Sequence, residues 1–590
     1  MKKEETIKEY ELIVVGGGLS GICASIAAAR EGIKTALIQN RPVLGGNSSS
    51  EVKLHVLGAD YHASRDNARE TGIIEEILLE NRKRNPQHSY SIFDTILWEK
   101  ANFQDNLDLY LNTHMNQVNT INQKIISVSA EQLTTEKLFK FKGKIFIDAT
   151  GDGTLGYLAG AEYMSGREGK DIFDEKFAPK QSDNKTMGSS ILMKAKKMNE
   201  VINFEKPFWA KTFTENDLKY RDHHEKFGFW WVEIGGDKLD TIKDAEQIRD
   251  ELLKTVYGVW DHIKNHGDHG ADKYALDWIG FLPGKRESRR LKGDYVLKEQ
   301  DLFAGKRFED AVAYGGWPMD IHTVGGIDNA DKKPTDWIEM DDLYTIPYRS
   351  LYSKNIKNLF LGGRAISVSH IAFGSTRVMA TCSVIGQALG TASALAIRKK
   401  IELKKISQNI DELQQKLLKE DCYIPGIKNK DSLDIARKAK VKASSCIKDS
   451  KADYVINGVA RTVKENLNCW ISKNMKNNKP EWLCFKLNKK RKVKEIRIKF
   501  DSNLSQEITI TLFPYRLSEQ KPGLPAELVK DYDLEFYNQN KIVHIEKIRN
   551  NYQRNNIINF SEEIECNQVK LKVLSTHGTK NARVFEVRIY

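Results

Sequence analysis

The sequence predicts an α/β protein in which a doubly wound, parallel-sheet domain is interrupted by an insertion and followed by an all-β sandwich. The apolar run 10–15 suits a strand buried on both faces, and it leads directly into glycines and an Ala-rich helix. Residues 170–345 change to a Trp- and Gly-rich texture, which is typical of a separate domain. Residues 431–590 contain period-2 segments separated by polar turns, the pattern of antiparallel strands.

The first strand, its glycines and the following helix form a recognisable unit. The chain has Gly16, Gly18 and Gly21 in the spacing G-x-G-x-x-G, and a second strand at 35–38 closes a βαβ unit. Gly16 would make the tight turn, Gly18 would let a pyrophosphate approach the backbone, and Gly21 would let the helix pack on the strand. The unit therefore predicts a Rossmann-type dinucleotide site.

The position that should bind the ribose hydroxyls departs from this pattern. An acidic residue is expected at the end of the second strand, but the chain has Gln39 and Asn40 there. Amide oxygens can accept the same hydrogen bonds without a charge. We therefore expect the site to bind its ligand with Gln39 and Asn40 in place of the carboxylate.

The remaining elements follow in chain order. Short alternating segments between 109 and 147, beginning with Leu109–Leu111, predict a small meander inserted in the doubly wound domain. A strand at 358–361 and a small-residue helix at about 379–398 return to that domain. The predicted boundaries are 1–165 for the first part of the cofactor domain, 166–344 for a substrate domain, 345–400 for the closing part of the cofactor domain, 401–430 for a helix and linker, and 431–590 for the sandwich.

Composition excludes several classes of protein. The chain has 590 residues with 40% hydrophobic and 29% charged residues, which is a globular composition. No window of eighteen unbroken apolar residues occurs, so we expect no spanning helix, and no secretory signal is recognisable, which predicts a cytoplasmic location. Seven scattered cysteines without C-x-x-C spacing argue against a disulfide scaffold or a cysteine zinc site.

The positive charge of the chain is confined to its C-terminal third. The net charge is +12, but residues 401–590 hold 37 Lys and Arg against 24 Asp and Glu, so the first 400 residues are almost neutral. Such an excess is usually a solvated face. We expect a small-molecule substrate, no nucleic acid and no membrane as partners.

Three further segments resemble glutathione-reductase-type flavoproteins. The loop 41–50 (RPVLGGNSSS) follows the second strand, 147–153 (IDATGDG) follows the meander, and 358–364 with 374–379 resembles the closing segment of that fold. The resemblance implies FAD as the cofactor. The residues it assigns to FAD binding are Gly16, Gly18, Leu19, Ser20, Gly21, Gln39, Asn40, Arg41, Gly45, Gly46, Asn47, Ser48, Thr150, Gly151, Asp152, Gly363, Arg364, Ser375, Arg377 and Val378.

The match can be narrowed to one family. The runs 39–51, 283–290, 346–349 and 362–379 look like a bacterial FAD-dependent oxidoreductase family common in polysaccharide-degrading bacteria. That resemblance covers about residues 8–400 and implies the fold and the cofactor but not the substrate. We expect a role in carbohydrate metabolism, with hydride transfer between flavin N5 and a small organic substrate such as a carbohydrate or sugar acid. In the tail, the runs 469–472 (CWIS) and 480–487 (PEWLCFKL) are similar to discoidin domains, which are galactose-binding-like sandwiches.

Hydride transfer from an alcohol carbon needs a base for the hydroxyl proton, and His serves best near neutral pH. In Asp320-Ile321-His322 the two polar side chains share one face of a strand, so Asp320 can orient His322. This pair is the first candidate for the base, and a purely structural His is the alternative. His370 lies in the segment before the small-residue helix at about 379–398, whose N-terminus is expected to face the flavin, and it is a candidate catalytic or substrate-contacting residue. His55 is a weaker candidate.

Two other groups of residues each allow two interpretations. Arg286 and Arg290, in the run 286–290, can grip an anionic group of the substrate or form an internal lattice of ion pairs. The histidines at 262, 266 and 269 have helical spacing, but glycines at 267 and 270 interrupt them. We expect a solvated helix end there and no metal site.

Different functions remain open beside the favoured one. A tRNA-modifying-type flavoprotein that binds RNA also opens with a triple-glycine pattern, and a flavoprotein that reduces a C=C bond uses the same cofactor. The sandwich can bind oligosaccharide or can be purely structural. Aromatic residues 229–231 and Trp317 can line a sugar site or belong to the core.

Overall fold

The computed structural model describes residues 5–223, 229–475 and 479–590, and only the backbone of residues 229–231. The prediction that the aromatic side chains of residues 229–231 line a sugar site or belong to the core therefore concerns side chains outside the described part of the structure. The chain forms two compact units: unit 1 comprises 1–61, 87–410 and 509–520, and unit 2 comprises 62–86, 411–508 and 521–590. These divisions differ from the predicted boundaries, because residues 62–86 join the C-terminal unit and 509–520 join the N-terminal one.

A five-stranded parallel sheet forms the centre of unit 1. Its order is β19-β8-β2-β3-β4, and every pairing is parallel. Four of the strands are almost wholly apolar and buried, as expected for a sheet covered on both faces, whereas only Leu107 is buried in the edge strand β4. The strands are β2 (Leu12–Val15), β3 (Thr35–Ile38), β4 (Leu107–Tyr110), β8 (Ile145–Asp148) and β19 (Leu359–Leu361).

The first strand predicted for the meander belongs to this sheet instead. The run Leu109–Leu111 overlaps β4, which pairs in parallel with β3 from Leu107 to Tyr110. The meander begins one strand later and packs its Val128 and Phe141 into the same core as Ile13 and Phe146. Its sheet order is β1-β7-β6-β5, with β1 (Glu5–Glu9), β5 (Thr113–Ile121), β6 (Lys124–Gln132) and β7 (Lys137–Lys142).

Two apolar helices pack against each other beside the parallel sheet. Helix α1 (Leu19–Arg30) follows the glycine turn, and α10 (Met379–Lys399) follows the closing strand. A Cβ added at Gly386 would lie 2.0 Å from the Ser20 carbonyl oxygen, so glycine permits this close approach. Helix α10 is long and apolar enough to cross a membrane, contrary to the expectation from unbroken windows, but 94% of its most apolar window is buried within the protein. Helix α3 (Tyr90–Asn102) packs beside α1 and β4.

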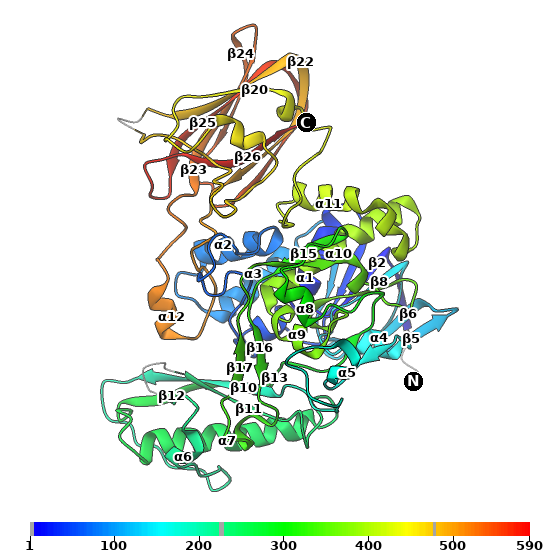
Figure 1. Cartoon of the computed structure of the whole chain (residues 1–590), viewed down its shortest axis with the longest axis vertical. Helices are drawn as coiled ribbons and strands as arrows, with labels where there is room; N and C mark the ends of the chain where they lie inside the picture. Colours follow the sequence, from blue (N-terminus) through cyan, green and yellow to red (C-terminus); the bar gives the residue numbers. More distant parts are fainter. Residues whose placement is uncertain (1–4, 224–228, 476–478) are drawn as a thin grey trace. The chain divides into compact units, whose positions relative to one another are not determined.

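The insertion carries its own small core. Strands β10 (Ser189–Lys197), β11 (Phe229–Ile234) and β12 (Tyr274–Ile279) pair antiparallel, and the amphipathic helix α7 (Ala245–Asn265) packs against them (Figure 1). Ile248, Leu252, Val256 and Trp260 of α7 are buried in this core. The short helix α6 (Glu215–Leu218) joins it through Leu218.

Short strands lead from the insertion back to the central sheet. β13 (Gly284–Lys285) pairs with β10, and β16 (Met319–His322) pairs antiparallel with β17 (Thr335–Ile338). Helix α9 (His370–Thr376) then precedes α10. The other elements of this part are β9 (Tyr163–Met164), β14 (Arg290–Leu291), β15 (Ala311–Gly315), β18 (Tyr344–Pro347), α4 (Thr154–Leu158), α5 (Lys170–Phe173) and α8 (Glu299–Phe303).

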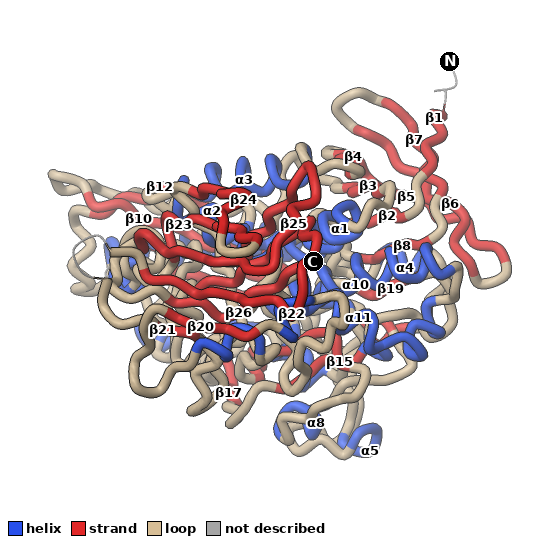
Figure 2. The backbone as a smooth tube through the Cα atoms, turned by 90° about the horizontal axis from the view of Figure 1, so that it is seen from above, coloured by secondary structure: helices blue, strands red, loops and turns tan. Residues whose placement is uncertain are grey.

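Unit 2 is dominated by antiparallel strands, drawn in red around the C-terminus in Figure 2. All its strand pairings are antiparallel, in the order β21-β26-β22-β25-β23-β24 with β20 beside β22. The mixed α/β class with a sheet-rich C-terminal region is thus confirmed. The elements are α2 (Ile73–Arg84), α11 (Ile410–Lys419), β20 (Lys440–Ala443), β21 (Trp470–Ile471), β22 (Glu481–Phe500), β23 (Val529–Asn538), β24 (Lys541–Ile548), β25 (Asn555–Thr576) and β26 (Arg583–Ile589), while α12 (Pro514–Glu519) belongs to unit 1.

Candidate active site

The glycine turn after β2 is closed by backbone contacts that exclude any side chain. Gly16 has φ +108°, and a Cβ there would lie 2.2 Å from the Ala149 carbonyl oxygen. A Cβ at Gly21 would lie 1.9 Å from the carbonyl oxygen of Gly16. Glycine at these two positions is therefore a requirement of the turn itself.

Gly18 is different, because a Cβ there would meet nothing within 4 Å. Gly18 is the N-cap of α1, and no side chain caps the helix. Its backbone pairs with Gly45, whose N–H donates to the Gly17 carbonyl at 2.8 Å. The result is an open space beside the uncapped amides of a helix N-terminus, which suits a phosphate group.

Gln39 serves the glycine turn directly. Its Oε1 accepts the Gly17 N–H at 2.9 Å, its Nε2 donates to the Val43 carbonyl at 3.1 Å, and the side chain is buried. The side chain expected to face a ribose thus holds two loops together. Arg41 forms a 3.8 Å ion pair with Glu51, and neighbouring Asn40 is exposed.

The loop after β3 is anchored at both ends. Gly45 has φ +103°, the Ser48 hydroxyl donates to its carbonyl, and Asn47 donates to the Lys285 carbonyl at 3.2 Å. The N–H of Ser50 donates to the Asp94 carboxylate of α3 at 3.0 Å. Burial raises the pKa of Asp94 to about 6, although the Ser50 hydrogen bonds oppose that shift.

Asp152, after β8, is the centre of an ion-pair network. It lies 2.8 Å from Lys285 Nζ and 2.9 Å from Arg364 Nη2, and it accepts the Ser288 hydroxyl. Burial raises the pKa of Asp152, but Arg364 and Lys285 outweigh it and leave the pKa below its ordinary value. Within the described part of the chain, the buried Nε of Arg364 has no hydrogen-bond partner and can serve a ligand.

Asp148 and Thr150 stabilise the turn that precedes Asp152. The Asp148 carboxylate accepts the N–H and hydroxyl of Thr150 and the N–H of Gly156. Gly151 has φ +81°, and a Cβ there would lie 2.9 Å from Arg364. The two segments predicted to enclose the cofactor are therefore in direct contact.

The closing segment returns to the start of α1. The N–H of Gly363 donates to the Ser20 hydroxyl at 2.9 Å, which joins the end of β19 to the first turn of α1. Ser375 bonds the Tyr344 hydroxyl and the Trp317 carbonyl. Val378 is the N-cap of α10, again without a side-chain cap. An open glycine cradle, two uncapped helix N-termini and an unpartnered arginine nitrogen together fit a dinucleotide such as FAD.

His322 lies in a buried cluster of five charged or titratable side chains, which we call the Glu233 cluster. Its Nδ1 lies 2.7 Å from Glu233 Oε2, its Nε2 lies 3.1 Å from Asp320 Oδ2, and Arg286 Nε donates to Nε2 at 3.2 Å. Both ring nitrogens are thus engaged within the protein. The members of the cluster are Glu233, Arg286, Asp320, His322 and Arg377.

Opposite charges balance in the Glu233 cluster. Burial raises the pKa of Asp320, but His322 and Arg377 outweigh that effect and leave the pKa below its ordinary range. Burial also raises the pKa of Glu233, and there Arg286 and His322 outweigh it with the same result. Arg377 Nη2 bonds Asp320 Oδ2 at 2.9 Å, and its buried Nε has no hydrogen-bond partner in the described part of the chain. Two carboxylates and two guanidinium groups thus leave the cluster close to neutral apart from His322.

His370 belongs to a second buried group. Its Nδ1 lies 2.9 Å from Glu287 Oε1, and its backbone N–H donates to Glu168. The ring is 2% exposed, and Nε2 makes no hydrogen bond to a described residue. Burial raises the pKa of Glu287, but His370 and Arg290 outweigh it and keep the carboxylate ionised.

Arg290 takes the second of its two possible roles. It is fully buried, its Nη1 bonds Glu168 and the Val368 carbonyl at 3.0 Å each, and its Nε lies 3.3 Å from Glu287. These contacts make it part of an internal lattice. Arg286 likewise bonds Ser190 and His322, with 12% of its side chain exposed.

Both histidine groups lie next to cofactor-binding segments. A Cβ at Gly374 of α9 would lie 3.1 Å from the backbone of Asp320, so β16 packs directly against the closing helix. Lys285, which contacts Asp152 and Asn47, immediately precedes Arg286. The structure thus brings together His322, Asp320, Arg286 and Arg377, and places His370 and Arg290 in the adjacent group.

Sequence reasoning did not identify Glu233 or Glu168, and it did not assign Glu287 to a histidine. Glu233 follows an aromatic run in a strand, and nothing in its neighbourhood signals a partner 89 residues away. The ring of His55 lies 5.1 Å from that of Phe513. Trp317 is buried and packs edge-on against Tyr61 and Trp337, as a core residue does.

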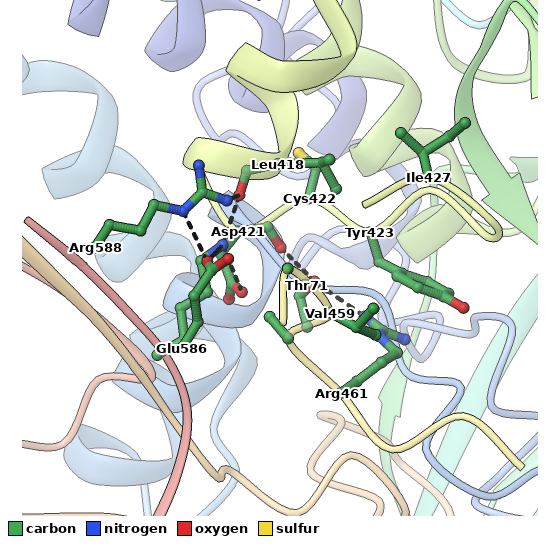
Figure 3. A pocket seen from close by; sticks show the side chains of 13 residues that line it. Thr71, Leu418, Asp421, Cys422, Tyr423, Ile427, Val459, Arg461, Glu586 and Arg588 are labelled. Atoms are coloured by element: carbon green, nitrogen blue, oxygen red, sulfur yellow. Dashed lines mark hydrogen bonds and ion pairs between the residues drawn. The ribbon is translucent and has the colours of Figure 1, made fainter. Parts of the chain in front are cut away.

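A pocket in unit 2 is lined mainly by groups that already have partners (Figure 3). Glu586 contacts Lys499 at 2.7 Å and Arg588 at 2.9 Å, and the Thr71 hydroxyl donates to the Asp421 carbonyl. Burial raises the pKa of Glu586, but Lys499 and Arg588 outweigh it and lower the value to about 2. Several of the charged groups that line the pocket are thus paired with one another.

Comparison with known proteins identifies the larger part of the chain. Residues 11–417 match the family model described as FAD dependent oxidoreductase. A segment of 95 residues is 28% identical to the alpha-glycerophosphate oxidase of Enterococcus casseliflavus, over 14% of this chain and 16% of that protein. The chain thus spans about a sixth of this curated relative.

Solved structures match over 27% of the chain. The family 32 carbohydrate-binding module of Clostridium perfringens NanJ, in complex with galactose, is 18% identical over 97% of its own length, with a TM-score of 0.20. The lectin domain of lectinolysin complexed with Lewis b antigen is 13% identical over 97% of its length, with a TM-score of 0.21. A fucose-binding module of Streptococcus pneumoniae is 15% identical over 96% of its length, with a TM-score of 0.21.

Proposed function

The chain belongs to the FAD-dependent oxidoreductase family, and from that premise we propose that it transfers a hydride between the flavin and an alcohol carbon of a carbohydrate or sugar acid. FAD, when bound, supplies the site that accepts or returns the hydride. The protein must supply a binding site for a hydroxylated substrate and a group that takes the hydroxyl proton.

The single observation that carries the proposal is the Glu287–His370 pair. Glu287 is ionised and accepts Nδ1–H, so the neutral His370 ring carries its lone pair on Nε2, which no described residue occupies. A buried carboxylate that orients an imidazole in this way is the arrangement of a general base. His370 therefore takes the hydroxyl proton in our proposal.

His322 has a different role in this proposal. Its Nδ1 faces the Glu233 carboxylate, which can only accept, and its Nε2 accepts a hydrogen bond from Arg286, so the ring lacks a free lone pair for a substrate proton. Together with Arg286 and Arg377 it forms a rigid polar surface. Because the two carboxylates and two guanidinium groups balance, this surface can exchange hydrogen bonds with neutral hydroxyl groups, and Arg377 Nε offers one further donor.

The partial match to an alpha-glycerophosphate oxidase guides the choice of substrates to test. The purified protein should be mixed anaerobically with neutral sugars, uronates, glycosides and glycerol phosphate while flavin absorbance is followed. A member of this panel that bleaches the flavin identifies the electron donor. Bleaching by glycerol phosphate alone would contradict a carbohydrate substrate, and failure of the whole panel with a fully loaded, reducible flavin would contradict oxidation of a sugar-like alcohol.

A further inference from the structure

Four side chains of the insertion converge on one point near the end of helix α7. We propose that Glu215, His223, His262 and His269 bind one zinc ion, which fastens the α6 segment to the C-terminal end of α7. Each side chain offers one ligand atom, and these four atoms all lie within 4.8 Å of one another. None of these four residues belongs to the proposed flavin or substrate sites.

The distances match a tetrahedral metal site. Glu215 Oε1 lies 3.0 Å from Nε2 of His262 and 3.0 Å from Nε2 of His269, and these two nitrogens are 3.3 Å apart. Nε2 of His223 lies 3.3 Å from Glu215 Oε2. With zinc–ligand bonds of about 2.0–2.2 Å, the edges of a tetrahedron are about 3.3–3.6 Å. Small side-chain rotations therefore suffice to place an ion between the four atoms.

Hydrogen bonds behind the rings orient two of the histidines for metal binding. Nδ1 of His262 lies 3.1 Å from the Phe213 carbonyl, and Nδ1 of His223 lies 2.7 Å from the Arg221 carbonyl. A carbonyl only accepts, so both rings carry Nδ1–H, and in the neutral form their lone pairs are on Nε2. Metal-binding histidines typically donate their other N–H to a carbonyl or carboxylate in this way.

Without a cation, this arrangement is electrostatically unfavourable when the rings are neutral. The Nε2 lone pairs of His223 and His262 then face a carboxylate that also carries only lone pairs. A divalent cation placed between these atoms removes that conflict.

The ligand set indicates zinc in a structural role. Three imidazole nitrogens, which are borderline donors, and one carboxylate oxygen, which is a hard donor, suit zinc. Four protein ligands fill a tetrahedral site and leave no position for a substrate, which indicates a structural role. The three histidine side chains are 3–13% exposed, whereas Glu215 is 63% exposed. Glu215 therefore closes the site from the solvent side.

The position of the ligands explains what the ion would stabilise. Glu215 begins α6, His262 is in the last turn of α7, and His269 follows the turn at Gly267, which has φ +129°. Leu218 of α6 is fully buried against the α7 core, and little regular structure precedes it between β10 and α6. A metal bond would hold this long connection against the helix.

His266 provides a matched control within the same sequence. It was grouped with His262 and His269 by spacing, but its side chain is 56% exposed and pairs with Asp261 at 3.2 Å instead. His266→Gln should therefore not affect metal binding. His262→Gln and His269→Gln should abolish it, and Glu215→Gln, which changes an exposed side chain, should weaken it without impairing folding.

The test uses the full-length holoprotein, purified without a polyhistidine tag. Metal analysis should find about one zinc per chain in the wild type and His266→Gln, much less in His262→Gln and His269→Gln, and equal FAD in all. Cobalt added after chelation should give intense visible bands typical of tetrahedral coordination, at wavelengths longer than those of the flavin. Chelation should lower the melting temperature of the wild type, and zinc should restore it.

Three results would overturn the proposal. One is a wild-type protein that binds no zinc, even after zinc is added to well-folded chelated protein. Another is equal zinc binding by the wild type, Glu215→Gln and His262→Gln. The third is octahedral cobalt spectra, which would indicate loose surface binding. If His262→Gln fails to fold, Glu215→Gln and the cobalt spectrum still decide the question.

Discussion

Glu287 Oε1 lies 2.9 Å from Nδ1 of His370, and both side chains are almost completely buried. Glu287 is also held by the Met187 N–H at 3.0 Å and by Arg290 at 3.3 Å. The carboxylate therefore keeps two partners if the imidazole is removed. This makes the pair suitable for separating catalysis from stability.

We expect His370→Ala to slow flavin reduction by a bleaching substrate by about 10²–10⁴-fold, the usual contribution of a general base. The flavin spectrum and FAD content should remain unchanged, because Glu287 stays paired. Stopped-flow absorbance measures the rate. Wild-type rates in the variant would refute the assignment of the proton acceptor.

His322→Ala is the contrasting variant. Removing the imidazole takes one cationic or hydrogen-bonding partner from each of the buried carboxylates Glu233 and Asp320. We therefore expect the free energy of unfolding to fall by about 3 kcal/mol or more. Urea unfolding checks this value. A stable His322→Ala protein whose only defect is slow flavin reduction would instead favour His322 as the base.

Gly18→Asp should fold normally but contain no FAD. The space beside Gly18 accommodates a side chain, but a carboxylate there would repel the pyrophosphate. Gly18→Asn is nearly equal in size and uncharged, and it should retain more flavin than Gly18→Asp. Equal flavin content in the two variants would show that charge is not the cause. Absorbance of the purified proteins gives the comparison.

Gln39→Glu should weaken FAD binding, although an acidic residue is common at the corresponding position of dinucleotide sites. A carboxylate can accept the Gly17 N–H but cannot donate to the Val43 carbonyl, which lies 3.1 Å from Nε2. We expect a stability loss of about 1–3 kcal/mol from this unsatisfied buried contact. Thermal unfolding and FAD titration measure the two effects. Tighter FAD binding by Gln39→Glu would show that the side chain faces the ribose.

The local cofactor motifs could be predicted from the sequence, whereas the partners of the histidines could not. The turn at Gly16–Gly21 is determined by contacts within one βαβ unit and one neighbouring segment, so its spacing carries the information. The partner of His322, Glu233, lies 89 residues away, and that of His370, Glu287, lies 83 residues away. Their distance depends on how β11, β13 and α9 pack, which no local pattern encodes.

The histidines near 262 show the same limit. Helical spacing groups His262 with His266, whereas the fold places His262 beside Glu215, 47 residues away, and beside His269. The interrupting glycines predicted a solvated helix end. Helix α7 does end at Asn265, but His262 in its last turn is buried rather than solvated. The glycines could not indicate that the chain turns back there.

Asp94 should make the protein less stable as the pH rises from 4 to 6. Its pKa in the folded protein is about 6, above the ordinary value of 3.8, so the folded state binds the proton more tightly than the unfolded chain does. The free energy of unfolding then falls with rising pH, by at most about 1.4 kcal/mol per pH unit from this group.

Asp94→Asn should remove this contribution while retaining an acceptor for the Ser50 N–H. Urea unfolding of both proteins between pH 4 and 7 tests this prediction. The free energy of unfolding of the variant, relative to that of the wild type, should increase as the pH rises. Asp434, whose pKa is also raised to about 6, is unchanged in both proteins and cancels from the comparison. A constant difference across this range would refute the assignment.

Glu586→Gln should destabilise unit 2 by about 3–5 kcal/mol, because Lys499 and Arg588 are buried and depend on this carboxylate. Glu563→Gln, which breaks an exposed pair with Lys492, should cost less than about 1 kcal/mol. Denaturant unfolding followed by circular dichroism gives both values. Similar losses in the two variants would contradict the buried network.

The discontinuous make-up of unit 2 affects how the protein is made in the cell. Arg69 and its neighbour Thr71 bond Asn503 and Asp421, and Asn503 follows Arg69 by 434 residues. At about 5–20 residues per second, a ribosome needs roughly 20–90 s to synthesise that stretch. During this time Arg69 and Thr71, which are buried in the finished protein, wait for these partners to be synthesised. Unit 2 therefore cannot complete its fold until its last strands have emerged.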